Sequence, residues 1–177
     1  LHKSSHSFPT RRSSDLGAVC CRTRLDGVLS GKVRRDGANS TDVLIELVQG
    51  SKFKGHVRAV LLQGIALAGF NVVDVHRLHA ALGVPVVVAV RKNPRIAMVK
   101  DALLDRTPGG ARKWKLVQAA GPLTQLGAMW VQHIGLAAPD ALALLRATTL
   151  HGNVPEPLRL AHLIAGGVTT GQSRGRA

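Results

Sequence analysis

The segment VRAVLLQGIALAGFNVVDVHRLHAALGVPVVVAVRK, residues 57–92, decides the fold. Its first part, VRAVLLQG at 57–64, is a continuous apolar run ending in glycine, which is typical of a strand buried on both faces of a parallel sheet. Its last part, VPVVVAVRK at 84–92, is a second such run and is almost purely β-branched. Between them, DVHRLHAALG indicates a helix that ends at Gly83. The strand–helix–strand order predicts an α/β protein.

Upstream of this segment, the pattern indicates a hairpin. GAVCCRTR (17–24) and GVLSGKVR (27–34) are two β-type runs joined around LDG, which predicts an antiparallel pair. Asp26 and Asp36 flank the second run beside glycines, and both are interpreted as turn residues.

Helical spacing follows the hairpin in NSTDVLIELVQGS, with Ser40 or Thr41 available as the N-cap. Further helices are expected around 95–104 and 110–119, within 138–149 and within 155–171, with a short strand pair within 121–135. The complete order predicts an α/β fold with a mixed sheet flanked by helices.

Charge is the strongest global signal. Lys and Arg total 24 against 10 Asp and Glu, a formal net charge of +14. Residues 1–16 contribute +2 of this, which leaves +12 for the rest. Such a basic domain is expected to bind polyanions, nucleic acid first; an alternative is that the Arg-rich composition reflects the genome. Since aromatic residues make up only 3%, contacts to phosphates are favoured over base stacking.

Several protein classes are disfavoured. No apolar run approaches the roughly 20 residues of a membrane span, and no secretory signal is visible. Cys20 and Cys21 are adjacent, which disfavours a mutual disulfide and a metal site and fits a reducing cytoplasm. A small-molecule α/β enzyme is disfavoured because neither a dinucleotide-binding nor a P-loop glycine pattern is present.

Residues 1–16 are set apart from the domain at 17–177. HSFPTRRSSDL, residues 6–16, is polar and has no strand or helix period. A basic arm or an unstructured terminus would explain it. The peptide also resembles, letter for letter, one reading frame of a common sequencing-library adapter, and is therefore interpreted as non-native.

Several motifs together resemble the endonuclease dU family, a mostly archaeal group related to endonuclease V. They are LDGVLSGKVRRDGANSTD, GSKF, GFNVVD, TTLHGNVPEPLRLAHLIA and SRGR, in that order along the chain. The resemblance implies a ribonuclease H-like fold and a DNA repair endonuclease. Its substrate would be DNA with deoxyuridine or another deaminated base, and its cofactor Mg²⁺ (or Mn²⁺) held by carboxylates.

The resemblance also implies metal and catalytic positions. Asp42 falls where endonuclease V has a Glu ligand, although it could equally serve the helix macrodipole. Gln63 occupies the position of the Asp in the Asp-Gly motif of endonuclease V, and an uncharged amide there should lower Mg²⁺ affinity. Asp74 is either a substitute ligand or the N-cap of the following helix.

Further positions would contact DNA or water. Arg91 matches a Lys after the buried strand and is a candidate phosphate clamp. His162, on the last helix, would orient water or bind metal, and His151 would reach the same cleft. Additional candidates for phosphate or base contacts are Asn71, Arg159 and Arg174.

The family fold implies one element that is missing here. Its first strand carries an indispensable Asp and is central in the strand order 3-2-1-4-5. Residues 1–16 stand in its place, and Asp15 is not a credible replacement. The hairpin and the strand at 57–64 are therefore expected to lack a neighbour, and this chain to be an impaired nuclease. The alternative is a non-catalytic nucleic-acid-binding protein on the same fold.

Overall fold

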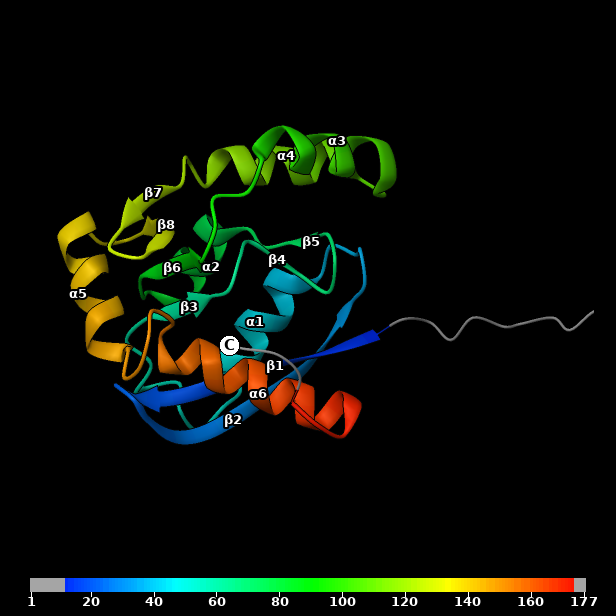
Figure 1. Ribbon diagram of the computed structural model, residues 1–177. Helices are drawn as coiled ribbons and strands as arrows, with labels where there is room; N and C mark the ends of the chain where they lie inside the picture. Colours follow the sequence, from blue (N-terminus) through cyan, green and yellow to red (C-terminus); the bar gives the residue numbers. More distant parts are fainter. Residues whose placement is uncertain (1–11, 174–177) are drawn as a thin grey trace, which may run out of the picture.

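The computed structural model describes residues 12–173 and shows a mixed α/β fold in which helices flank a mixed sheet (Figure 1). The strands are β1 Arg12–Cys21, β2 Arg24–Arg34, β3 Val60–Leu62, β4 Ala66–Leu67, β5 Asn71–Val72, β6 Val86–Val90, β7 Thr124–Leu126 and β8 Met129–Ile134. The helices are α1 Ser40–Gln49, α2 Val75–Leu82, α3 Ile96–Arg106, α4 Gly110–Ala119, α5 Ala138–Thr148 and α6 Glu156–Thr170. The predicted fold class is confirmed at this level.

Strand β6 lies inside the four-stranded sheet, whose order is β3-β6-β8-β7. β3 pairs with it in parallel and β8 antiparallel. Alternate side chains enter different cores: Val88 belongs to a cluster with Leu78 of α2, and Val87 to a cluster with Leu145 of α5. Because both faces are buried, the strand is apolar throughout, and the strand predicted at 84–92 is confirmed.

The predicted hairpin is present, but its turn lies elsewhere. β1 and β2 pair antiparallel from Arg12 opposite Arg34 to Cys21 opposite Arg24. The chain therefore reverses at Arg22 and Thr23, with Arg22 in the left-handed region at φ 56, and the prediction of a turn around 25–27 is wrong. Gly27 lies inside β2, where a Cβ would collide with the ring of Phe53.

The hairpin forms a sheet of its own. Among the described residues, no strand pairs with the second edge of β1, and none with the second edge of β3. The expectation that the hairpin and the strand at 57–64 lack a neighbour stays a prediction for the complete chain. Residues 12–16, which the sequence sets apart from the domain, extend β1, because main-chain pairing does not require particular side chains. Residues 1–11 lie outside the described residues.

The helices agree with the sequence pattern apart from their ends. The N-cap of α1 is Asn39, one residue before the predicted caps, because Ser40 is already helical and its hydroxyl donates to the Val72 carbonyl. The short β4–β5 ladder, within GIALAGFNVVD, was not predicted. Between residues 12 and 173, no helix has both the length and the apolar character needed to cross a bilayer.

Candidate functional site

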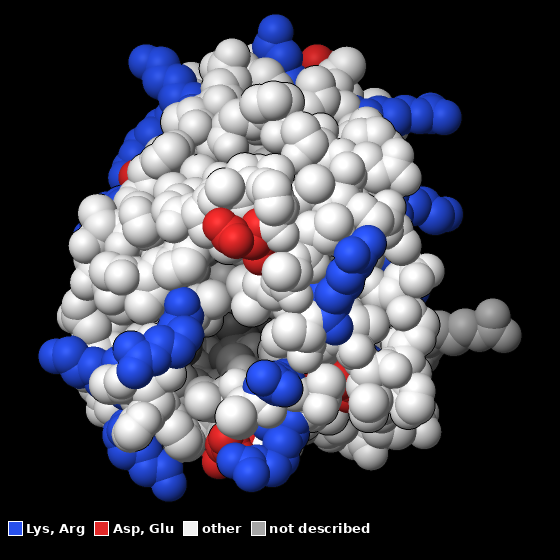
Figure 2. Space-filling model, turned by 90° about the vertical axis from the view of Figure 1, so that its left-hand side faces the viewer, with Lys and Arg blue, Asp and Glu red and all other residues white. Residues whose placement is uncertain are grey.

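A cavity of about 1170 Å³ lies between the hairpin and β3. Residues 16–21 line one side and residues 56–63 the other, with side chains of α1 and α6 closing it. Its volume exceeds the roughly 300–1,000 Å³ of common ligand sites. Figure 2 shows a hollow in one face of the molecule, with Lys and Arg side chains beside it.

Two of the predicted catalytic residues share this cavity. Gln63 follows the last residue of β3, and His162 lies in the second turn of α6; both line the cavity and both are exposed. Within the described part of the chain, no hydrogen bond occupies either side chain. The Gln63 amide and the His162 ring are therefore available to a ligand as donors and acceptors.

The other two predicted metal ligands lie together, but not in the cavity. Asp42, in the first turn of α1, pairs with the Arg77 guanidinium at 2.5 Å. The Arg77 amide donates to Asp74 Oδ1 at 3.0 Å, so Asp74 is the N-cap of α2 and this alternative is confirmed. The Asp74 amide in turn donates to Thr41 Oγ1 at 2.9 Å.

The described residues do not bring the predicted Mg²⁺ ligands together at one site. Mg²⁺ requires near-octahedral oxygen ligation, and within the described residues no three His, Cys, Asp or Glu side chains are close enough to hold a metal. Of the predicted ligands Asp42, Gln63 and Asp74, only Gln63 lines the cavity. The sequence spacing did not reveal that Asp42 lies away from the cavity, because the pattern does not say on which side of α1 its side chain lies.

Arg159 is engaged by a carboxylate that the sequence analysis missed. Its Nε and Nη2 donate to the two oxygens of Glu156, at 2.9 and 2.7 Å, and the Glu156 side chain is only 3% exposed. The Arg159 hydrogen bond lowers the pKa of Glu156 and outweighs burial. The i, i+3 spacing in PEPLR was the available signal. Glu156 therefore occupies these two nitrogens in the described structure, and the phosphate contact by Arg159 stays a prediction.

Asn71 is also a structural residue, because it is fully buried. Its Oδ1 accepts the Ser40 amide at 3.1 Å, and its Nδ2 donates to the Arg34 carbonyl and to Asn39 Oδ1, both at 2.9 Å. The predicted contact of Asn71 with phosphate or base is therefore wrong. Its side chain instead joins β2, the start of α1 and β5.

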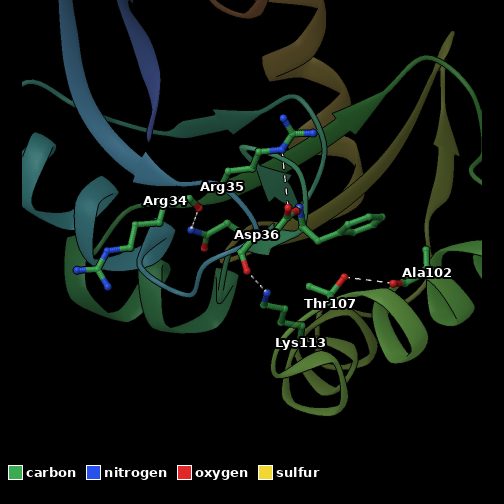
Figure 3. A network of polar contacts seen from close by, with 8 residues as sticks. Arg34, Arg35, Asp36, Ala102, Thr107 and Lys113 are labelled. Carbon is green, nitrogen blue, oxygen red and sulfur yellow. Dashed lines mark hydrogen bonds and ion pairs between the residues drawn. The ribbon is translucent and has the colours of Figure 1, made fainter. Parts of the chain in front are cut away.

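Asp36 continues this network (Figure 3). It has a left-handed backbone at φ 54, its Oδ1 accepts the Phe70 amide at 2.8 Å, and its carbonyl accepts Lys113 Nζ at 2.6 Å. Burial lowers the pKa of Lys113, and the Asp36 charge partly opposes this. The interpretation of Asp36 as a turn residue is confirmed. The motif that contains it, LDGVLSGKVRRDGANSTD, and the GFNVVD motif both contribute to this network and so stabilise the fold.

The remaining predicted contacts are on the surface or outside the described residues. Arg91, just after β6, and His151, before α6, are both exposed. Arg174 lies outside the described residues. Asp26 pairs with the exposed Arg24 at 2.7 Å. Burial, followed by the charges of nearby carboxylates, raises the pKa of the Cys20 thiol.

These features define a basic α/β protein with a large cavity beside the edge of its mixed sheet. The sequence profile of the family described as Endonuclease dU matches residues 5–169. The chain belongs to the endonuclease dU family, and the resemblance stated from the sequence is confirmed.

Relatives and one solved structure support this assignment. A UPF0215 protein of Deinococcus radiodurans is 51% identical over 160 residues, covering 90% of this chain and 81% of that protein. A UPF0215 protein of Archaeoglobus fulgidus is 36% identical over 171 residues, covering 97% and 94%. The crystal structure of a protein of unknown function from Archaeoglobus fulgidus DSM 4304 is similar with a TM-score of 0.87 and 34% identity, covering 93% of this chain and 94% of that one.

Proposed function

We propose that this protein is a DNA repair endonuclease that acts at deaminated bases, deoxyuridine first, and that its mixed α/β fold is of the ribonuclease H-like type. Membership in the endonuclease dU family is the observation that carries the proposal. The net charge of +14 supports it, because a strongly basic protein attracts the phosphate backbone of DNA.

The proposed DNA contact is the opening of the cavity at Gln63 and His162. An exposed amide can both donate to and accept from a base edge or a phosphate. An exposed imidazole has one ring nitrogen that can accept a proton and one that can donate it, which suits it to orient or deprotonate water. Arg91 and His151 are exposed and remain candidate phosphate contacts.

We also propose that strand cleavage by this chain is weak. The resemblance to endonuclease V implies an Asp at position 63, and Gln63 carries no charge to hold a divalent cation. Because the described residues provide no cluster of three metal-binding side chains, the expected dependence on Mg²⁺ or Mn²⁺ has to be measured directly.

The test uses duplex DNA with one deoxyuridine, the same duplex with thymidine, and the full chain. We expect slow nicking of the deoxyuridine duplex in Mg²⁺ or Mn²⁺ and none in EDTA. Gln63→Asp should raise the nicking rate at least tenfold, whereas Gln63→Asn, which matches aspartate in size but not in charge, should not. If Gln63→Asp produces no nicking in either metal, the nuclease assignment fails for this chain.

A non-catalytic DNA-binding protein is the second candidate. It is favoured by the missing metal cluster among the described residues. Such a protein would bind both duplexes equally in EDTA and in Mg²⁺, and its affinity would fall steeply as salt increases. Retained binding without nicking by any Gln63 variant would support this candidate.

A further inference from the structure

Residues 91–115 carry a marked excess of positive charge. They hold eight Lys and Arg against two Asp, and they form α3, α4 and the loop before α3. From residue 106 to residue 139 the sequence contains no Asp or Glu. Figure 1 places α3 and α4 side by side at the top of the molecule, away from α6, and Figure 2 shows Lys and Arg side chains projecting at the top.

The inner face of this helical pair is explained by the fold. Leu103 of α3 and Val117 of α4 belong to one buried cluster with Val72 of β5. Lys113 is 4% exposed and donates to the Asp36 carbonyl. These contacts fix α4 against the body of the protein, so the opposite face of the helix lies in solvent.

Arg112 and Lys115 lie on that opposite side, which we call the α4 face. Both are exposed, and their three-residue spacing puts them on one side of the helix. In the described part of the chain, no carboxylate forms an ion pair with either side chain. By contrast, Arg24, Arg77 and Arg159 each pair with an Asp or Glu. The α4 face therefore holds two cations, about one helical turn apart, that the fold leaves free.

The position of Arg112 within the helix is unfavourable for a cation on its own. α4 begins at Gly110, and its first turn contains no acidic residue. The N-terminal end of a helix carries partial positive charge, which attracts anions and repels cations. Arg112 therefore adds to a positive potential that the helix end already has, and an external anion would be attracted by both.

We propose that the α4 face is a contact for the phosphate backbone of duplex DNA, separate from the opening of the cavity. The proposal rests on the proposed function in taking DNA as the partner. Lys and Arg side chains contact phosphate oxygens without reading bases. The contact therefore adds affinity on any sequence and holds the duplex at a second place beyond the lesion.

An anionic membrane matches this face less well. Helices that lie on membranes present an apolar face to the lipid beside their cations. In α4 the apolar residues Trp114, Leu116 and Val117 pack toward the core. Small and polar residues such as Ala111 and Gln118 are exposed instead, so little apolar surface could enter a bilayer.

The test measures binding of the full chain to the thymidine duplex in EDTA, by fluorescence anisotropy over a series of salt concentrations. Arg112→Gln/Lys115→Gln removes the charges of the α4 face. Lys32→Gln/Arg34→Gln is the matched control, because it removes one Lys and one Arg from exposed positions of β2. Each lost phosphate contact lowers the slope of log affinity against log salt by about 0.9. We expect the α4 pair to lower this slope by about 2 and to weaken binding about tenfold at low salt, and the control to leave the slope unchanged.

Equal effects of the two pairs would overturn the proposal, because net charge alone would then explain binding. So would an unchanged slope for the α4 pair, or a loss of binding to vesicles of anionic phospholipid without any loss on the duplex. Arg112→Lys/Lys115→Arg keeps both charges and should bind like the wild type, and circular dichroism checks that each variant is folded. DNA binding that depends on the α4 face, without nicking of the deoxyuridine duplex, would contradict the proposed function and support this contact.

Discussion

Replacing Arg159 with methionine tests how strongly the buried carboxylate of Glu156 depends on its ion pair. Methionine keeps most of the aliphatic part of the side chain and removes both hydrogen bonds, at 2.9 and 2.7 Å. Because the Glu156 side chain is 3% exposed, water cannot readily replace the lost partner. The variant should therefore be folded but clearly less stable.

The size of the effect can be bounded. Breaking a buried ion pair costs about 3–5 kcal/mol, but Arg159 is 36% exposed, and solvent screening reduces the value of such pairs. Without Arg159, the Glu156 carboxylate can become protonated instead of staying charged and unpaired. Protonating a glutamate of ordinary pKa at pH 7 costs about 3.7 kcal/mol, which is therefore an upper limit on the stability loss. We expect a loss of about 2–3 kcal/mol, which lowers the melting temperature by roughly 4–12 °C.

The assay is urea unfolding followed by circular dichroism, for the wild type, Arg159→Met, Glu156→Gln and the double variant. The pKa of Glu156 is lowered in the folded chain, so its stabilisation is present above the ordinary glutamate pKa and disappears as the pH falls through the lowered value. The difference between wild type and Arg159→Met should thus be full at pH 7 and shrink in acid below about pH 4.

The double variant should lose less than the sum of the two single losses, because the neutral amide no longer needs a cation. A loss below about 0.5 kcal/mol for Arg159→Met at pH 7, the usual range of inert surface changes, would refute this reasoning. Additive single losses would refute the assigned pairing.

Three further predictions follow from local geometry. Gly110→Ala should destabilise the chain by about 2 kcal/mol or more in thermal melts, because the added Cβ would collide with the main chain of α3. The control Gly167→Ala lies in open space on α6 and should be neutral or stabilising by up to about 1 kcal/mol. The pKa of Lys113 is lowered in the folded chain, so the unfolded chain binds more protons than the folded chain as the pH approaches the ordinary lysine pKa of about 10.4. The free energy of unfolding should therefore rise with pH through the alkaline range. Lys113→Met should flatten that rise in unfolding curves. A thiol reagent should modify the exposed Cys21 before Cys20, whose pKa is raised, as peptide mass spectrometry would show.

The sequence predicted elements well where one local pattern determines the structure. β6 is buried on both faces, so its unbroken β-branched run could be read without its neighbours. Helix α2 begins at the Asp74 cap and ends at Gly83 in a left-handed conformation, and both signals are local.

Prediction failed where distant parts of the chain decide a residue's role. Asn71 is a polar residue in the GFNVVD motif, but its partners are 31–37 residues away, and its complete burial has no local signal. Gly27 suggested a turn, whereas the approach of Phe53 explains it. For Asp42, Arg77 on the next helix takes the carboxylate, which sequence spacing does not show.

The polar network in Figure 3 gives the hairpin one fixed end. Asn71 and Asp36 attach the main chain around Arg34 to β5 and its turn, while the reversal at Arg22 lies at the opposite end of the ladder. The reversal at Arg22 therefore lies at the end of the hairpin that this network does not hold, and amide hydrogen exchange is expected to be faster there than around Arg34. Opening and closing at that end of the hairpin would change the width of the cavity entrance without disturbing β6.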